Sequence, residues 1–143
     1  MSELLDRHHR VMGDHAPLFY EEPLTLQSGD GVWLETLSGD RYLDLYNNVP
    51  CVGHANPRVV ANLSEQAATL NVHSRYLHEG VVNYVERLVG LHHEGIESAI
   101  LGCSGTEATE MALTLARTVT GKRGIICTDA TYHGNSSLVG RLS

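Results

Sequence analysis

A turn rich in small residues, set between an apolar run and a helical pattern, constrains the fold of this chain most strongly. The apolar run covers residues 98–102, and the turn, which begins at the last residue of this run, reads Gly-Cys-Ser-Gly-Thr over residues 102–106. A helix is expected over residues 105–119, and its inward positions at helical spacing are Met111, Ala112, Leu115 and Val119. A second apolar run covers residues 124–130. This order predicts a strand, a helix and a strand, which together form a βαβ unit of a parallel sheet in an α/β protein.

The turn fits three different uses. Ser104 and Glu107 have the spacing of a capping box, which starts a helix without any ligand. Alternatively, Gly105 and Thr106 would hold a phosphate, because the first turn of a helix offers free backbone N–H groups and the Thr hydroxyl adds a donor. A nucleophilic Ser104 is the third interpretation, although a G-x-S-x-G elbow requires Gly where Thr106 stands. The patterns of a Walker loop and of a dinucleotide fingerprint are both absent.

A second group of residues follows the second apolar run. Tyr132, His133 and Gly134 come directly after the expected strand, and ligands of open α/β sheets bind beyond the carboxyl ends of the strands. A planar ring whose phosphate is held at residues 105–106 would lie within reach of Tyr132, which could stack on it. An ordinary loop explains the same residues without a ligand.

The region before the turn predicts a small β-meander followed by two helices. Turn chemistry at residues 28–31 and 38–40 separates expected strands between residues 24 and 46, and a short helix is expected within residues 1–22. Asn56 and Pro57 are a cap residue and a first-turn proline, so a helix is expected to begin there. A second helix is expected over residues 79–93, with one apolar face formed by Val82, Val85, Leu88 and Val89.

Composition excludes several classes of protein. The chain has 143 residues, enough for one domain, and a formal net charge of −7 that argues against non-specific nucleic-acid binding. No apolar run approaches the roughly 20 residues of a membrane span, and the N-terminus lacks the core of a signal peptide. Three widely spaced cysteines suit reduced thiols in the cytoplasm, and no metal site is expected.

Several segments together resemble the class III aminotransferases, which are fold type I enzymes dependent on pyridoxal phosphate (PLP). The resemblance runs from Leu24 to Ser137, and its most specific parts are "CSGTEATEMALTLAR" and "YHG". It implies that Ser104, Gly105 and Thr106 bind the cofactor, the last two at its phosphate. It also implies that Tyr132 stacks on the pyridine ring beside His133 and Gly134. Cys103 stands where many members have Asn.

One branch of the family has similar segments upstream. "NNVPCVGHANP" and "LNVHSRYLHE" resemble the branch of ethanolamine-phosphate and phosphohydroxylysine phospho-lyases. This resemblance implies that Asn47, Asn48, Arg75 and Tyr76 lie on the substrate side, with Ser74 beside them. Packing of Arg75 and Tyr76 at a dimer interface is the alternative.

The resemblance also implies an incomplete enzyme. Residues 1–56, the N-terminal segment and the β-meander, would be part of the small domain, and residues 57–143 the start of the PLP-binding large domain, with the remainder of the large domain and the C-terminal domain absent. The single lysine, Lys122, follows the helix at the end opposite the proposed cofactor site, so the Schiff-base lysine is expected beyond Ser143. We therefore expect the full-length protein to be a homodimeric aminotransferase acting on a small-molecule amine. A phospho-lyase, or an inactive truncated or binding fragment, is the alternative.

Overall fold

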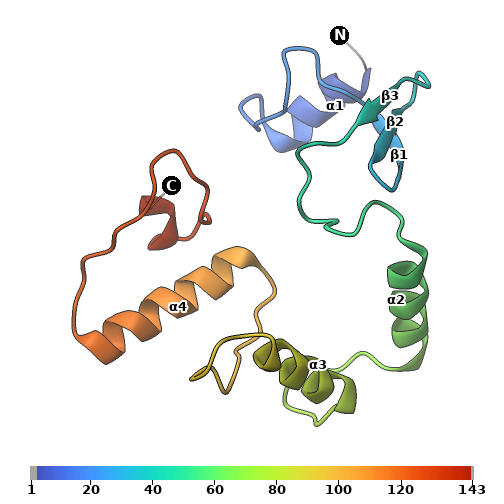
Figure 1. Ribbon diagram of the computed structural model, residues 1–143. Coiled ribbons are helices and arrows are strands. Elements are labelled where there is room, and N and C mark those ends of the chain that lie inside the picture. The colour runs from blue at the N-terminus through green and yellow to red at the C-terminus, as the bar shows by residue number, and fades with distance from the viewer. Residues whose placement is uncertain (1–2, 143) are drawn as a thin grey trace. The chain divides into compact units, whose positions relative to one another are not determined.

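The computed structural model (Figure 1) describes residues 3–142, which divide between His73 and Ser74 into two compact units. The first unit contains helix α1 (Glu3–Met12), strands β1 (Leu26–Asp30), β2 (Trp33–Thr36) and β3 (Arg41–Leu43), and helix α2 (Pro57–Thr69). The second contains helices α3 (Glu79–Gly90) and α4 (Gly105–Thr120) and a short 3₁₀ helix, η1 (Val139–Arg141). The units divide after His73, and the predicted boundary between the small and large domains after residue 56 stays a prediction. The assignment of residues 57–143 to a PLP-binding domain stays a prediction.

The predicted β-meander is present in the first unit. Its three strands pair antiparallel in the order β1-β2-β3. The first turn lies later than expected, because Ser28, Gly29 and Asp30 belong to β1 and the loop consists of Gly31 and Val32. Gly31 has a φ of +56°, which a glycine adopts without strain, so this glycine sets the turn.

Helix α2 begins where the sequence predicted. The side-chain oxygen of Asn56 accepts hydrogen bonds from the backbone N–H groups of Arg58, at 3.1 Å, and Val59, at 3.3 Å. Pro57 occupies the first helical position, where its missing N–H costs nothing. Asn56 therefore satisfies two donors that the helix itself leaves without acceptors.

Helix α4 has a local start and a local stop. Its N-cap is Ser104 and its C-cap is Gly121, which adopts the left-handed conformation with a φ of +67°. Thr120 is the last helical residue, and the N–H of Gly121 donates to the carbonyl of Arg117. The helix is thus one residue longer than the sequence predicted. Helix α3 begins at Glu79 as predicted and ends at Gly90 rather than at residue 93.

The two strands predicted on either side of α4 do not form. Within residues 3–142, the β-meander is the one sheet, and residues 98–102 and 124–130 belong to no strand. A strand is stabilised by hydrogen bonds to a neighbouring strand, and neither segment is paired in the described part of the chain. The two apolar runs are therefore present in the sequence, but they lack the hydrogen bonds between strands that a βαβ unit requires.

The apolar faces of the helices are mostly open to solvent. Of the α4 positions expected to face inward, Met111 is half-buried, whereas Leu115 and Val119 are 50% and 83% exposed. On α3, Val85, Leu88 and Val89 are half-buried and Val82 is exposed. Among the described residues, Val139 is the one buried hydrophobic side chain. In the same residues, no helix combines the length and the apolar character that crossing a bilayer requires.

Candidate functional site

The turn before α4 forms the capping arrangement that the sequence predicted. Oγ of Ser104 accepts a hydrogen bond from the N–H of Glu107 at 3.1 Å. The Glu107 carboxylate reaches back to the N–H of Cys103 at 2.6 Å, one residue earlier than in a standard capping box. The Ser104 hydroxyl is thus used to start the helix, which favours a cap over a nucleophile at this position.

The first turn of α4 can also receive an anion. Gly105 and Thr106 are its first two residues, and their N–H groups have no acceptor inside the helix because the carbonyls four residues back lie outside it. Apart from its chain neighbours and the backbone of its own helix, nothing lies within 4 Å of the position that a Cβ on Gly105 would occupy. The space beside Gly105 is therefore open, and the positive end of the helix dipole faces it.

A loop that follows α4 in the chain returns to the start of this helix. Oγ1 of Thr106 donates to Oδ1 of Asn135 at 3.3 Å and accepts from the N–H of Asn135 at 3.4 Å. Gly134 is buried, and a Cβ there would lie 2.8 Å from Oγ1 of Thr106. A hydrogen bond from Ser136 to the Glu110 carboxylate joins the same loop to the next turn of α4. The structure therefore brings Thr106 and Gly134 together.

The other two predicted residues of this loop, Tyr132 and His133, come directly before Gly134. The Tyr132 side chain is 76% exposed, so its ring is accessible from solvent. Nε2 of His133 lies 2.8 Å from Oγ1 of Thr131, two residues earlier. The role of both side chains beside a cofactor ring stays a prediction.

The predicted substrate-side residues fall in both compact units. Asn47 and Asn48 follow β3 in the first unit, and the N–H of Asn47 donates to Oδ1 of Asp44 at 2.8 Å. Arg75 and Tyr76 lie between α2 and α3 at the beginning of the second unit, and Tyr76 is 64% exposed. Their roles toward a substrate stay predictions.

The carboxylate of Asp44 joins the segment after β3 to His54 in the first unit. Its Oδ1 accepts from the N–H groups of Tyr46 and Asn47, and its Oδ2 lies 2.6 Å from Nε2 of His54. These contacts, first the N–H of Asn47 and then the His54 ring, hold the pKa of the Asp44 carboxyl well below its ordinary value. The backbone of His54 in turn pairs with Gly31 in the hairpin loop, through bonds of 2.8 and 3.0 Å. Asp44 therefore fixes the segment that carries Asn47.

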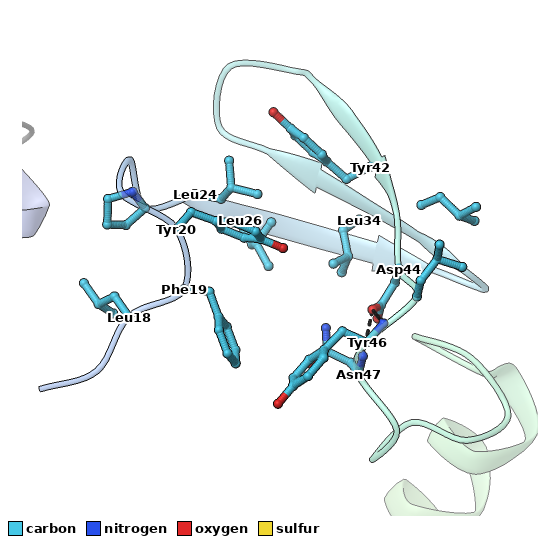
Figure 2. A pocket seen from close by; sticks show the side chains of 13 residues that line it. Leu18, Phe19, Tyr20, Leu24, Leu26, Leu34, Tyr42, Asp44, Tyr46 and Asn47 are labelled. Carbon is cyan, nitrogen blue, oxygen red and sulfur yellow. Dashed lines mark hydrogen bonds between the residues drawn. The ribbon is translucent and has the colours of Figure 1, made fainter. Parts of the chain in front are cut away.

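A pocket of about 390 Å³ lies in the first unit beside this segment (Figure 2). Leu26 of β1 and Leu34 of β2 line it on one side. The rings of Phe19 and Tyr46 meet edge to face with their centres 4.9 Å apart, as Figure 2 shows. Asn47 is also part of the lining, so the one predicted substrate-side residue in this pocket stands beside aromatic side chains.

Sequence reasoning missed Asn135, Asp44, His54 and the aromatic lining of the pocket. Both Asp44 and His54 lie within residues 24–137, over which the family resemblance runs, and His54 belongs to the segment "NNVPCVGHANP", so the resemblance contained a signal for them. Asn135 directly follows the "YHG" motif. Phe19 precedes the region of resemblance, and its contact with Tyr46 depends on how the chain folds back. Within residues 3–142, no group of three or more His, Cys, Asp or Glu side chains is placed to hold a metal ion.

Comparison with known proteins identifies a family. The model of the class-III aminotransferases matches residues 19–140. A Drosophila melanogaster protein named alanine–glyoxylate aminotransferase 2-like is 34% identical over 143 residues, which is 99% of this chain and 29% of that protein.

Solved structures agree with this assignment. A phospholyase from Arthrobacter in complex with phosphoethanolamine matches with a TM-score of 0.93 and 46% identity, over 99% of this chain and 33% of that one. A transaminase with PLP bound matches with a TM-score of 0.80 and 27% identity, over 95% of this chain and 33% of that one. The chain thus shares the fold type I architecture of the PLP-dependent transaminases and spans about a third of the length of the proteins that it matches.

The predicted resemblance is therefore confirmed at the level of family and cofactor class. The family uses PLP, and one of the matched structures holds it. The open space at Gly105, the free N–H groups of the first turn of α4 and the Thr106 hydroxyl suit the phosphate of that cofactor. Since the family model covers residues 19–140, the chain belongs to the class-III aminotransferase family.

Proposed function

We propose that this chain supplies the phosphate-binding part of the PLP site of an enzyme that acts on a small primary amine. The observation that carries the proposal is the start of α4, where Gly105 leaves open space beside free N–H groups and the Thr106 hydroxyl. Phosphate binding at the N-terminus of a helix needs these features. Thr106 and Gly134 are in contact, so the residue proposed to hold the phosphate is joined to the loop that carries Tyr132.

Bound PLP supplies an electron sink for the carbon that carries the substrate amine. The residues of this chain would contribute binding and orientation. The backbone N–H groups of Gly105 and Thr106 would hold the phosphate, and the exposed ring of Tyr132 would orient the pyridine ring by stacking on it. Lys122 follows the C-cap Gly121 at the far end of α4 from the proposed phosphate site, so we expect another lysine of the whole protein to react with the cofactor.

We propose elimination of phosphate from a phosphorylated amino alcohol as the reaction. The support is the 46% identity with the Arthrobacter phospholyase, which was solved with phosphoethanolamine, together with the segments around Asn47 and Arg75 that resemble the phospho-lyase branch. Transfer of the amine to a keto acid is the second candidate, favoured by the 34% identity with the Drosophila aminotransferase-like protein.

The two reactions are distinguished by their products. The gene product that carries these 143 residues is incubated with PLP and phosphoethanolamine, and inorganic phosphate and ammonia are measured. In parallel it is incubated with alanine and glyoxylate, and glycine is measured. Release of phosphate and ammonia in equal amounts supports the lyase, and formation of glycine supports the aminotransferase. If the protein forms none of these products, the proposed activity is contradicted.

The proposed phosphate site is tested by binding. Thr106→Val removes one donor to a charged group, which contributes about 1.5–3 kcal/mol, so the affinity for PLP should fall by roughly tenfold or more. The affinity for pyridoxal, which lacks the phosphate, should not change. Both affinities are measured by equilibrium titration of the chain. Unchanged PLP affinity in the variant would count against phosphate binding at residues 105–106.

Assembly and location are part of the same proposal. We propose a homodimer, because apolar side chains on α3, such as Val82, are exposed within the described chain and the family resemblance implies paired subunits. We propose a cytoplasmic location because the three cysteines are all free and exposed, and free thiols persist in a reducing compartment. Sedimentation of the gene product tests the first proposal, and fractionation of its host cells tests the second.

A further inference from the structure

The Thr106 hydroxyl has a single proton, and that proton is already engaged by Asn135. Oγ1 of Thr106 lies 3.3 Å from Oδ1 of Asn135, and since an amide oxygen can only accept, the hydroxyl is the donor. The N–H of Asn135 donates to the same Oγ1 at 3.4 Å. One residue thus satisfies Thr106 both as a donor and as an acceptor.

The loop keeps its place against α4 by other contacts as well. Gly134 packs on Thr106 so closely that a Cβ would lie 3.0 Å from the Thr106 Cα. Ser136 donates to the Glu110 carboxylate one helical turn further along, and Val139 is fully buried. Removing the Asn135 side chain should therefore leave the loop on the helix, and the backbone N–H of residue 135 would still donate to Thr106.

From this geometry we propose that the Asn135 side chain competes with the cofactor phosphate for the hydroxyl proton of Thr106, and so lowers the affinity of the site for phosphate. The inference rests on the proposed function, in which the phosphate binds at Gly105 and Thr106. For Thr106 to donate to a phosphate oxygen, its hydrogen bond to Asn135 must break. The exchange replaces one hydrogen bond by another and transfers no proton.

The expected change in affinity follows from the free energy of the hydrogen bond between Thr106 and Asn135. A hydrogen bond between neutral groups makes a small net contribution, equivalent to about a two- to tenfold change in an equilibrium constant. Asn135→Ala removes the competing acceptor from the free site and takes nothing from the phosphate-bound site. The variant should therefore bind phosphate ligands about two- to tenfold more tightly than the wild type.

The test uses two ligands that differ in the phosphate alone. Pyridoxine 5′-phosphate and pyridoxine carry no aldehyde, so they form no imine with Lys122. Their dissociation constants for the wild-type chain, Asn135→Ala and the control Ser137→Ala are measured by calorimetric titration. We expect tighter binding of pyridoxine 5′-phosphate to Asn135→Ala, unchanged binding of pyridoxine, and wild-type behaviour of Ser137→Ala, which alters a neighbouring exposed serine.

A double variant shows whether Asn135 acts through Thr106. The Thr106→Val variant lacks the hydroxyl proton for which Asn135 and the phosphate would compete. In that variant, Asn135→Ala should give no further gain in affinity for pyridoxine 5′-phosphate. A structural effect of Asn135 would persist in that background. Far-UV circular dichroism of each variant verifies that α4 is retained.

Each outcome of these titrations supports or overturns the competition between Asn135 and the phosphate. A wild-type preference for pyridoxine 5′-phosphate with unchanged or weaker binding by Asn135→Ala overturns the competition while leaving the proposed phosphate site intact. A gain that persists in the Thr106→Val background overturns it too. A wild-type chain without any preference for the phosphorylated ligand overturns both the proposed phosphate site and this inference.

Discussion

At the scale of single residues, Asp44 links the charge state of a side chain to local structure. Its carboxylate accepts two backbone N–H groups and contacts His54, and 6% of the side chain is exposed. Its pKa is lower in the folded chain than in the unfolded chain, so the ionised carboxylate stabilises the fold at any pH above the ordinary aspartate pKa of about 4. That stabilisation is lost as the pH falls below about 4 toward the folded-state pKa.

Asp44→Asn should therefore lower the melting temperature of the first unit at pH 6. It should also reduce the further fall in melting temperature between pH 6 and pH 3, because the ionisable group is gone. Trp33, the one tryptophan in the chain, lies in β2 and reports the transition by fluorescence. Asp30→Asn is the control, since it changes an exposed aspartate at the hairpin. Equal pH dependence in wild type and Asp44→Asn would mean that Asp44 does not stabilise the fold.

Gly134 is the second residue whose identity is dictated by its position. Its φ of +140° disfavours any other residue, and a Cβ would approach Oγ1 of Thr106 to 2.8 Å. Gly134→Ala should destabilise the second unit by roughly 1–3 kcal/mol, the cost of a residue in a sparsely populated backbone conformation. Urea unfolding followed by circular dichroism measures the change. Gly124→Ala, at a site with open space, should be nearly neutral, and equal effects of the two substitutions would contradict this account.

At the scale of elements, the helices of this chain are fixed mainly at their ends. Asn56 caps α2, Ser104 caps α4, and Gly121 ends α4 in a left-handed conformation. These contacts span at most four residues, so they form wherever the local sequence occurs. The apolar faces add little burial within the described residues, where no side chain of α2, α3 or α4 is buried.

Helix α2 should therefore depend strongly on its cap. Asn56→Ala removes the acceptor for two N–H groups and should cost about 0.5–2 kcal/mol, seen as a loss of ellipticity at 222 nm. Asn62→Ala is the matched control inside the same helix, and it should raise helicity because Ala has the higher helix propensity. A loss of the same size from both substitutions would show that the cap contributes nothing specific.

At the scale of the whole molecule, the chain separates the proposed phosphate site from its single lysine. Gly105 begins α4, and Lys122 follows Gly121 at the other end of a helix of 16 residues. Such a helix is about 24 Å long, and a lysine side chain reaches only about 6 Å. Lys122 therefore cannot react with a cofactor that is held by its phosphate at Gly105.

We predict that PLP does not label Lys122 specifically in the 143-residue chain. The chain is mixed with PLP and reduced with borohydride, and the modified residues are mapped by mass spectrometry. Stoichiometric labelling of Lys122 together with turnover would contradict the placement of the phosphate at the start of α4. Labelling that is incomplete and equal in the Thr106→Val variant would be the expected background, since it does not use the phosphate site.

Features that depend on residues close together in the chain could be predicted from the amino-acid order. The N-caps of α2 and α4, the meander and the family motifs could all be predicted, because the capping bonds at Asn56 and Ser104 join residues two or three apart and a motif is visible as written. Only the tertiary structure placed Asn135 on Thr106 and Ser136 on Glu110, which are 29 and 26 residues apart. The tertiary structure also left residues 98–102 and 124–130 unpaired, because an apolar run becomes a strand only when another strand accepts its hydrogen bonds.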